Sequence, residues 1–572
     1  MNQKGIRFML VVLSLVVFVS SAFAQTPKDV FAKNGMVSAA NELASKAGVE
    51  ILKKGGNAVD AAVATALALN VVEFNASGIG GGGFMTIRFA KTGEVVALDY
   101  REMAPASATK DMFASEQSKK DKWSLDGGKA VAVPGWLTGM HYALEKYGTM
   151  TFAQVAAPAI RLAEEGFTLH PMQNGIIADD FERLSRFNDP ERVPFFKDGL
   201  PLPAGAVLKQ PKLGKLFRLI GEKGPKAFYE GEVADAIVAA VNKTGGKMTL
   251  NDLKNYRMEV RTPMIGTYRG YKLYSTPPAS SGGAHIIQLM NILELFPMAE
   301  YGHNSPKAMH VFAEANKLIF ADRAAFMADT AFVQVPLEGL ISKAYAKTLA
   351  AKINPDKIMQ EVLPGDPWKF QKEQKRARVG GMGSEQMSTS SFSTVDAAGN
   401  IVASTNTVNY FCGSGVMVPE FGFLLNNEMD DFSQNPQSVN APEPGKRPLS
   451  SMSPTIVLDP KGRPYMSIGA AGATKIFTSI AQIIMNTVDY GMTMSEAIQV
   501  PRVHNQLVGK NAGKFQTEKH MDPKLIALME MRGFVVDRNI HIGTAQGILF
   551  DHTKGMINGG ADFRRLGVPV GY

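Results

Sequence analysis

The stretch from Met387 to Asn400 constrains the fold more than any other part of this 572-residue chain. It begins with a cluster of serine and threonine residues and continues with the alternation of apolar and polar residues that is typical of a half-buried strand. It ends in a Gly-Asn turn, and a second strand-like run, Ile401 to Val408, follows at once and includes Thr407. The two runs predict adjacent strands joined by a tight turn.

The residues upstream give the hydroxyl cluster a chemical interpretation. Leu363 to Ser388 is rich in Lys, Arg, Gly and Gln and has no apolar period, so it predicts a mobile connector. A connector that leads into a hydroxyl at the start of a core strand suits self-cleavage, in which Thr389 attacks the carbonyl carbon of Ser388. The new α-amine, with a reference pKa of about 7.7–8.0, then acts as base for its own hydroxyl. Taken alone, the stretch also fits an ordinary hairpin with surface serine and threonine residues.

Residues 1–24 have the pattern of a secretory signal peptide. Two cations precede an apolar run from Phe8 to Val19, and Ala22-Phe23-Ala24 fits a cleavage site. The run is too short to span a membrane, and no later stretch is long or apolar enough to do so. We therefore expect an exported protein with no membrane span, located in the periplasm or, alternatively, outside the cell.

The net charge and the cysteine content indicate whether the mature chain binds nucleic acid and whether it forms disulfide bonds. Removal of Lys4 and Arg7 with the signal peptide lowers the formal net charge from +8 to +6. The densest basic stretch, Lys372 to Arg378, lies in the connector and is interpreted as solvated linker, so no nucleic acid partner is expected. Cys412 is the only cysteine, so no internal disulfide can form.

Two motifs that suggest ligands have a simpler interpretation. Gly78 to Gly83 formally matches the dinucleotide fingerprint, but it connects a predicted helix (Ala58 to Asn70) to a predicted strand (Phe84 to Phe89), the reverse of a nucleotide-binding loop. His310 and Glu314 lie four residues apart on a predicted helix, but no third ligand accompanies them. Neither nucleotide binding nor a metal site is expected.

Several polar stretches occur at the ends of predicted strands. Arg101 ends the strand Val95 to Tyr100, and residues 426–431 concentrate acids after another strand. A hydroxyl-rich turn occupies residues 446–454. Residues 468–474 lead into a helix and could place two backbone N–H groups where a developing oxyanion is stabilised. Taken singly, each stretch also fits an ion pair, a capped turn or close packing of a strand on a helix.

Together these stretches resemble the γ-glutamyltranspeptidases, also called glutathione hydrolases. The resemblance covers nearly the whole mature chain and is most distinctive at residues 55–62, 78–83, 99–105, 277–283, 426–432 and 448–454. It implies the α+β fold of the N-terminal nucleophile hydrolases, an αββα sandwich. A large subunit, residues 25–388, and a small subunit, residues 389–572, are cut from one precursor and form this sandwich jointly as a heterodimer.

The resemblance also implies a role for individual residues. Thr389 is the nucleophile and Thr407 positions it, with the chain cut between Ser388 and Thr389. The residues implied to hold the α-carboxylate of a γ-glutamyl group are Arg101, Ser450 and Ser451. Those implied to surround its α-ammonium are Asn409, Glu428 and Asp431, and those implied to form the oxyanion pair are Gly472 and Ala473.

The reaction implied by the resemblance begins with attack on a γ-glutamyl amide such as glutathione. The attack forms an ester on Thr389 and releases the amine. Water then completes hydrolysis, or an amino acid or peptide acceptor takes the acyl group. The resemblance implies no metal and no organic cofactor.

Three positions depart from the family pattern. Ser390 and Ser391 follow the nucleophile where threonine and histidine are common, and Ala473 replaces the second glycine of the oxyanion pair. Ser433 to Gly445 is short beside family members that carry a lid loop there, which predicts a more open pocket.

Two other functions remain alternatives. Cephalosporin or glutaryl acylases share the fold and the nucleophile but act on side chains without an α-ammonium, and Glu428 and Asp431 count against them. The second alternative, an exported binding protein that has lost catalysis, is opposed by the intact catalytic set.

Overall fold

The computed structural model describes residues 29–372, 388–507 and 512–572. The predicted signal peptide and most of the predicted connector lie outside these residues. The first part of the predicted connector is described, and Pro367–Phe370 forms a 3-10 turn there (η3).

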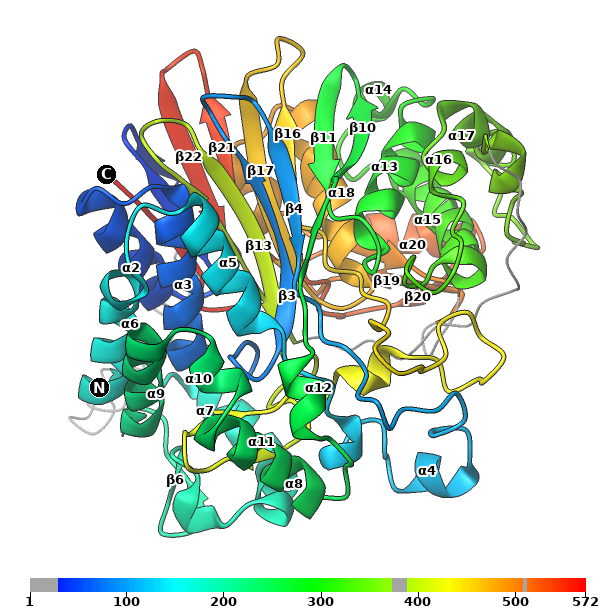
Figure 1. Ribbon diagram of the computed structural model, residues 1–572. Coiled ribbons are helices and arrows are strands. Elements are labelled where there is room, and N and C mark those ends of the chain that lie inside the picture. The colour runs from blue at the N-terminus through cyan, green and yellow to red at the C-terminus, as the bar shows by residue number, and fades with distance from the viewer. Residues whose placement is uncertain (1–28, 373–387, 508–511) are drawn as a thin grey trace, which may run out of the picture.

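Two seven-stranded antiparallel sheets stack face to face at the centre of the molecule (Figure 1). The sheet that contains the predicted strand pair, here called the β12 sheet, has the order β23 (Val568–Gly571), β2 (Met36–Ala39), β12 (Ser390–Val395), β13 (Ile401–Thr407), β3 (Gly82–Arg88), β4 (Val95–Asp99) and β9 (Glu259–Arg261). The other, the β17 sheet, has the order β1 (Val30–Ala32), β22 (Met556–Ala561), β21 (Thr544–Asp551), β17 (Pro464–Ala471), β16 (Thr455–Leu458), β11 (Tyr271–Ser275) and β10 (Met264–Tyr268).

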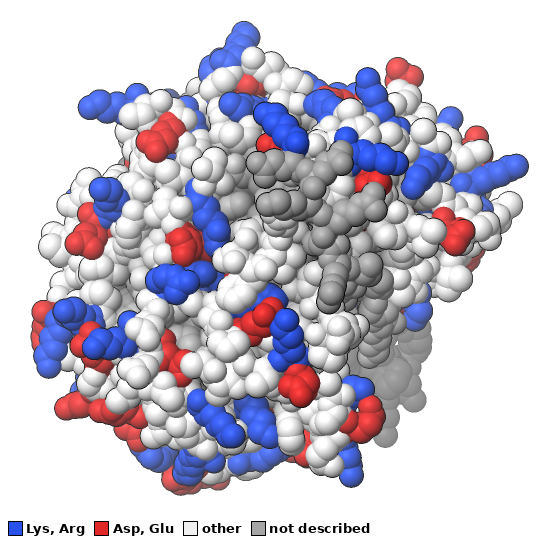
Figure 2. Space-filling view, turned by 45° about the vertical axis from the view of Figure 1, so that its right-hand side comes forward, with Lys and Arg blue, Asp and Glu red and all other residues white. Residues whose placement is uncertain are grey.

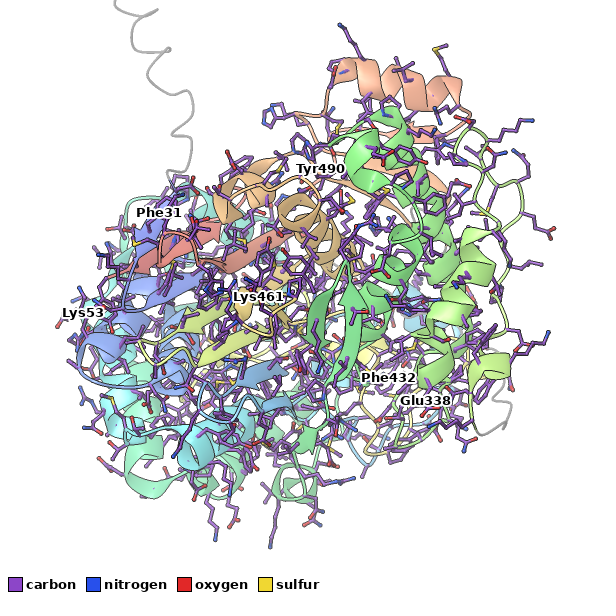
Figure 3. All side chains as sticks on the ribbon, turned by 90° about the horizontal axis from the view of Figure 1, so that it is seen from above. Phe31, Lys53, Glu338, Phe432, Lys461 and Tyr490 are labelled. Carbon is purple, nitrogen blue, oxygen red and sulfur yellow. The ribbon has the colours of Figure 1, made fainter. Side chains whose placement is uncertain are left out.

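Helices cover the outer face of each sheet. The helices on the side of the β12 sheet are α2 (Glu42–Lys53), α3 (Ala58–Val72), α5 (Trp136–Tyr147) and α6 (Phe152–Glu165). Those on the side of the β17 sheet are α13 (Gly282–Leu293), α15 (Pro306–Phe326), α18 (Lys475–Val488) and α19 (Met494–Gln499). Figure 3 places Lys53, at the end of α2, and Tyr490, just after α18, on opposite sides of the sheets. The predicted αββα sandwich is confirmed.

The remaining elements connect and flank these layers. Between residues 151 and 255 the chain is mostly helical, with α7 (Pro171–Asp179), α8 (Phe181–Phe187), α9 (Pro211–Lys223), α10 (Lys226–Tyr229), α11 (Glu232–Lys243) and α12 (Leu250–Lys254). The other elements used below are β15 (Phe423–Leu424), η4 (Glu428–Asp431) and α20 (Pro523–Met531).

Strand β12 is buried on both faces, which explains its hydroxyl-rich sequence. Phe392 belongs to the core shared with the α3 layer, whereas Ser393 faces the β17 sheet and shares a hydrogen bond of 2.9 Å with Ser467. Ser391 donates to Gln546 of β21 in the same interface. Buried polar groups need partners, and the hydroxyls of β12 find several of theirs across the interface between the sheets.

Helix α3 is buried along its whole length because it lies between the β12 sheet and α6. Asn57 caps the start of this helix. The Asn57 side chain accepts from the backbone of Val59 and Asp60, and Asp60 accepts from the backbone of Asn57 in return. This helix ends at Val72, and the glycine run that follows leads into β3, so the predicted order of helix before strand is confirmed.

The sequence from Tyr268 to Ser275 is strand-like and predicts a single strand, and this prediction is wrong. Tyr268 to Ser275 is not a single strand, because Arg269 and Gly270 have φ angles of 51° and 86° and turn the chain between β10 and β11. Consecutive positive φ angles are those of the tight turns that close two-residue hairpins.

The predicted helical pair His310 and Glu314 is packed in the protein interior. His310 shares a hydrogen bond of 2.9 Å with the Asn354 carbonyl, and Glu314 contacts Lys317 at 2.6 Å. Within the described ranges no group of three or more His, Cys, Asp or Glu side chains is placed to hold a metal ion.

Candidate active site

The two threonines singled out in the sequence lie side by side at one end of the β12 sheet. Thr389 immediately precedes β12, Thr407 is the last residue of β13, and their Oγ1 atoms are 3.1 Å apart. The backbone N–H of Asn409 donates to Thr407 Oγ1 at 2.8 Å. Because that oxygen already accepts one hydrogen bond, its own hydrogen is available for Thr389. Antiparallel pairing of the two predicted strands is what brings the hydroxyls together.

The backbone at Thr389 has an unusual conformation. Its φ angle is 106°, a region that β-branched residues rarely adopt, and its carbonyl accepts from the guanidinium of Arg565. Such outliers cost about 1–3 kcal/mol and persist only where the surroundings impose them. The peptide bond between Ser388 and Thr389 is intact in this structure, so the nitrogen of Thr389 is an amide here.

The glycine run has a structural role at this site. A Cβ on Gly81 would lie 1.9 Å from the carbonyl oxygen of Thr407, and one on Gly80 would lie 2.2 Å from that of Leu424. Asn426 donates to the Gly80 carbonyl at 2.8 Å. The run therefore lets the end of β13 and the acidic segment after β15 approach the same backbone, which no larger residue would allow.

Arg101 lies at the centre of a buried ionic cluster. Its side chain is 1% exposed, its Nη1 lies 2.6 Å from Glu428 Oε2, and its Nη2 contacts Asp431. Burial alone would lower the pKa of Arg101, but the carboxylates of Glu428 and Asp431 raise it. The guanidinium is therefore a permanent cation that two carboxylates hold in a fixed plane.

A third carboxyl group, that of Glu102, lies beside this cluster and was not singled out in the sequence. It is fully buried, 3.7 Å from Arg101 Nη1, and burial raises its pKa to about 8. Glu102 is therefore mostly protonated at neutral pH.

Asn409 links the threonine pair to the ionic cluster. Its side chain donates to the Asn427 carbonyl at 3.0 Å, and the next residue along the chain is Glu428. Thr389, Thr407, Asn409, Glu428 and Arg101 are therefore joined by consecutive contacts and one peptide bond. The structure brings together six of the residues predicted for the site, namely these five and Asp431.

Ser450 and Ser451 lie close by but are held by other residues. The Ser450 carbonyl accepts from the backbone and the hydroxyl of Ser281, both at 2.8 Å, and Arg323 donates to Ser451 Oγ at 3.1 Å. Arg101 Nε donates to the carbonyl of Pro448, two residues before Ser450, at 3.2 Å. Arg323 extends from the long helix α15 and was not singled out in the sequence.

The predicted oxyanion pair joins β17 to α18. Gly472 has a φ of 134° and Ala473 a φ of 57°, and both directly precede the helix, whose N-cap is Thr474. A Cβ on Gly472 would lie 2.7 Å from the Cα of Gly543. Gly472 and Arg565 line the same cavity of about 240 Å³, and Arg565 is the residue that connects this loop to Thr389.

The segment from Ser433 to Gly445 is folded compactly against the acidic turn. Asn440 is buried, donates to the Asp431 carbonyl at 2.8 Å and accepts from the backbone of Leu449 at 3.2 Å. Lys446 extends back to the carbonyls of Val439 and Ala441. This short segment therefore ties together the two stretches that flank it, η4 and the hydroxyl-rich turn.

Charges of both signs are interspersed on the face shown in Figure 2, and no continuous basic stripe crosses the described part of it. No helix among the described residues has the length and apolar character needed to cross a membrane.

A comparison with protein families identifies the family of this chain. The family model described as gamma-glutamyltranspeptidase matches residues 44–572. The chain belongs to the γ-glutamyltranspeptidase family. The resemblance recognised from the sequence is therefore confirmed.

The proteins similar to this γ-glutamyltranspeptidase-family chain include both a glutathione hydrolase and an acylase. A glutathione hydrolase proenzyme of Escherichia coli (strain K12) is 41% identical over 560 residues, which cover 94% of this chain and 92% of that protein. Among solved structures, a cephalosporin acylase from Bacillus halodurans superposes with a TM-score of 0.85 at 29% identity, covering 96% of this chain and 98% of that one. A Helicobacter pylori gamma-glutamyltranspeptidase chain gives a TM-score of 0.56 at 40% identity, covering 59% of this chain and 96% of its own length.

Proposed function

We propose that this protein is an autoprocessing γ-glutamyl hydrolase and transferase that uses Thr389 as its nucleophile. It cleaves the γ-glutamyl amide of glutathione and related compounds and passes the acyl group to water or to the amine of an amino acid or peptide. The observation that carries the proposal is the continuous set of contacts from the Thr389 and Thr407 hydroxyls to the buried Arg101 cluster.

The first step of this mechanism is self-cleavage. Thr389 Oγ1 attacks the carbonyl carbon of Ser388, the C–N bond breaks, and the nitrogen takes a proton to become the α-amine of Thr389. Water then hydrolyses the resulting ester and leaves Thr389 as a new N-terminus. Two features support this step: Thr407 orients the attacking hydroxyl, and the φ of 106° destabilises the intact backbone at the bond to be cut.

Turnover of an external amide repeats the same chemistry. The freed α-amine takes the proton of Thr389 Oγ1 as it attacks the γ-carbonyl of the donor, and gives that proton to the departing amine. The amides of Gly472 and Ala473, at the N-terminal end of α18, are proposed to stabilise the oxyanion. The γ-glutamyl ester on Thr389 then reacts with water or with an acceptor amine.

The ionic cluster is proposed to select the donor. A γ-glutamyl group carries a carboxylate and an ammonium on one carbon, so its site needs opposite charges close together. Arg101 supplies a planar cation, and Glu428 and Asp431 supply anions within contact of it. When the donor binds, its carboxylate forms an ion pair with the Arg101 guanidinium, and its ammonium forms ion pairs with Glu428 and Asp431. The ion pairs within the protein are thus replaced in part by ion pairs with the donor.

The similarity to a cephalosporin acylase structure makes acylase activity the second candidate. A comparison of γ-glutamyl and glutaryl anilides, which differ only in the α-ammonium, separates the two functions. We expect a preference for the γ-glutamyl anilide of at least about a hundredfold, the scale of discrimination by a lost buried polar contact. Equal rates on the two anilides would favour the acylase.

Processing is tested on a denaturing gel. The mature protein should run as two fragments that begin at Gln25 and Thr389, and Thr389→Ala should remain one chain. Amino-terminal sequencing of both fragments checks the proposed signal cleavage and the internal cut, and cell fractionation checks the proposed export to the periplasm. A fully active single chain would contradict the mechanism.

A further inference from the structure

The cavity between Gly472 and Arg565 has no role in the donor site described above. It has a volume of about 240 Å³, and its other lining residues include Met172, Ile176 and Phe411, which form an apolar wall. Pockets for drug-sized ligands span about 300–1,000 Å³, so this cavity suits a single amino acid or a dipeptide.

Arg565 presents part of its guanidinium to this cavity. Its side chain is 8% exposed, and Nη1 makes both of its polar contacts, to the Thr389 carbonyl and, at 3.4 Å, to Glu73. Within residues 29–372, 388–507 and 512–572, its Nε and Nη2 donate to no protein group. The Phe411 ring lies 5.2 Å from the guanidinium carbon and supports its plane. Two donors of a buried arginine therefore remain for a ligand.

The other basic residues that line the cavity are not available in this way. Arg564 is paired with Asp562 at 2.9 Å and with Glu518. Burial lowers the pKa of His541 to about 4, so its imidazole is neutral at neutral pH. Arg565 is therefore the cation that can attract a carboxylate into the cavity.

We propose that this cavity is the subsite for the amine partner of the reaction, which is the leaving amino acid or peptide in acylation and the acceptor in transfer. The inference rests on the proposed function. Arg565 binds the α-carboxylate or C-terminal carboxylate of the partner, and Met172, Ile176 and Phe411 contact its side chain. Because Arg565 also holds the Thr389 carbonyl, the bound amine lies next to the nucleophile and the Gly472 loop.

In the transfer step the neutral amine of the bound acceptor attacks the acyl carbon of the Thr389 ester. A C–N bond forms, the C–Oγ1 bond breaks, and its electron pair stays on Oγ1. The acceptor nitrogen loses one proton and Oγ1 gains one, with the α-amine of Thr389 as the carrier. The products are a γ-glutamyl amide and the restored threonine hydroxyl.

Ile176 and Phe411 also line a second, larger cavity of about 520 Å³ that includes Tyr410 and Arg183. The two shared residues make the cavities neighbours. A longer peptide acceptor could therefore extend from the Arg565 subsite toward α7 and α8.

The test compares acceptors that differ in one carboxylate. Transfer from a γ-glutamyl anilide to glycylglycine and to glycylglycinamide is measured as kcat/KM for each acceptor, corrected to the concentration of neutral amine. We expect the wild type to prefer glycylglycine at least tenfold. Met172, 39% exposed at the cavity, is replaced by Glu, Gln and Lys. Met172→Glu should lower the preference about fivefold or more relative to Met172→Gln, and Met172→Lys should maintain or increase it.

Two controls make the result specific. The same three substitutions at Met531, 82% exposed on α20 and absent from the cavity lining, should leave the preference unchanged. Arg565→Gln should abolish the preference if it matures, and the Met172 series decides the question if it does not. No preference in the wild type, or the same preference in Met172→Glu and Met172→Lys, would overturn the subsite.

Hydrolysis without acceptor separates this inference from the proposed function. A wild type that does not hydrolyse the γ-glutamyl anilide in a Thr389-dependent way refutes the proposed function and the subsite together. Normal hydrolysis combined with indifference to the acceptor carboxylate refutes the subsite alone.

Discussion

Arg101 Nη1 lies 2.6 Å from Glu428 Oε2, and both side chains are almost completely buried. The two residues come from segments more than 300 positions apart, on either side of the proposed cut, so the donor site exists only when both segments are folded together. The pair also means that the site holds its own counterions before any substrate arrives, which avoids an uncompensated buried charge.

The first prediction concerns this cluster. Asp431→Asn keeps the shape but removes one anion, and it should raise the KM for a γ-glutamyl anilide by at least tenfold while hardly changing the reaction of a glutaryl anilide. Arg101→Lys should weaken donor binding similarly because it loses the planar fork. Arg502→Lys, at the buried pair with Asp562, is the control, since it should lower stability without changing the KM for the donor. Equal effects of Asp431→Asn on both anilides would contradict the assignment.

The second prediction concerns the Thr407 hydroxyl. Thr407→Val keeps the shape of the side chain and should slow self-cleavage, turnover or both by about a hundredfold, because the hydrogen bond that orients Thr389 is lost. Thr407→Ser should retain most of both activities. Thr405, two residues earlier on the same buried strand, has a hydroxyl without a partner among the described residues, so Thr405→Val is a matched control that should mature normally. The rate of fragment appearance on a gel gives the comparison.

The third prediction separates strain from crowding in the Gly472 loop. Gly472→Ala should lower both the Tm and turnover, because it adds a Cβ at a positive φ and 2.7 Å from Gly543. Gly491→Ala is the control for strain alone, since its φ is 66° and nothing lies within 4 Å of the added carbon. Ala473→Gly should retain turnover and should not lower the Tm, because it relieves a left-handed alanine that costs about 1–2 kcal/mol. A large loss of turnover in Ala473→Gly would show that its methyl group fixes the loop.

The fourth prediction is a pH dependence of stability. The folded-state pKa of Glu102, about 8, lies above its unfolded value, so between about pH 4.5 and 8 the folded chain binds more protons than the unfolded one. Stability therefore falls as pH rises through this window, by at most about 1.4 kcal/mol per pH unit.

Glu102→Gln should remove that contribution. Urea unfolding of the single-chain Thr389→Ala protein at pH 5.5 and 7.5, with and without Glu102→Gln, measures the difference. The stability of the Gln variant relative to its parent should increase with pH. A difference that does not change with pH would show that Glu102 does not titrate in this range.

Several elements of the sandwich could be predicted from sequence because they have strong local signals, whereas the sandwich itself was implied by the resemblance to the family. The hydroxyl-rich strand with its turn, the capped helix at Asn57 and the order of helix, glycine run and strand all follow from short-range rules. The hairpin at Arg269 and Gly270 was missed because its turn residues are not the usual Asn-Gly or Asp-Gly.

Some residues of the candidate site could likewise be predicted from the sequence, and others could not. Thr389 and Arg101 occur in distinctive motifs, so a pattern of residues identifies them. Arg323 and Arg565 act through contacts between segments far apart in the sequence, and nothing in their local sequence distinguishes them from surface charges. Glu102 lies in the same motif as Arg101, but its raised pKa comes from burial, which the motif does not reveal. Their burial, which gives them chemical importance, is a property of the tertiary structure alone.

The position of strand β23 has a consequence for how the chain is made. β23 is formed by the last residues of the chain and pairs with β2 near the start, with Gly571 opposite Met36, while β12 pairs with the other edge of β2. Arg565, which holds the Thr389 carbonyl, lies just before β23. The surroundings of the proposed cleavage site therefore lack both Arg565 and β23 until residues 565–571 have been synthesised and folded. We expect a polypeptide that stops before Arg565 to remain uncleaved between Ser388 and Thr389.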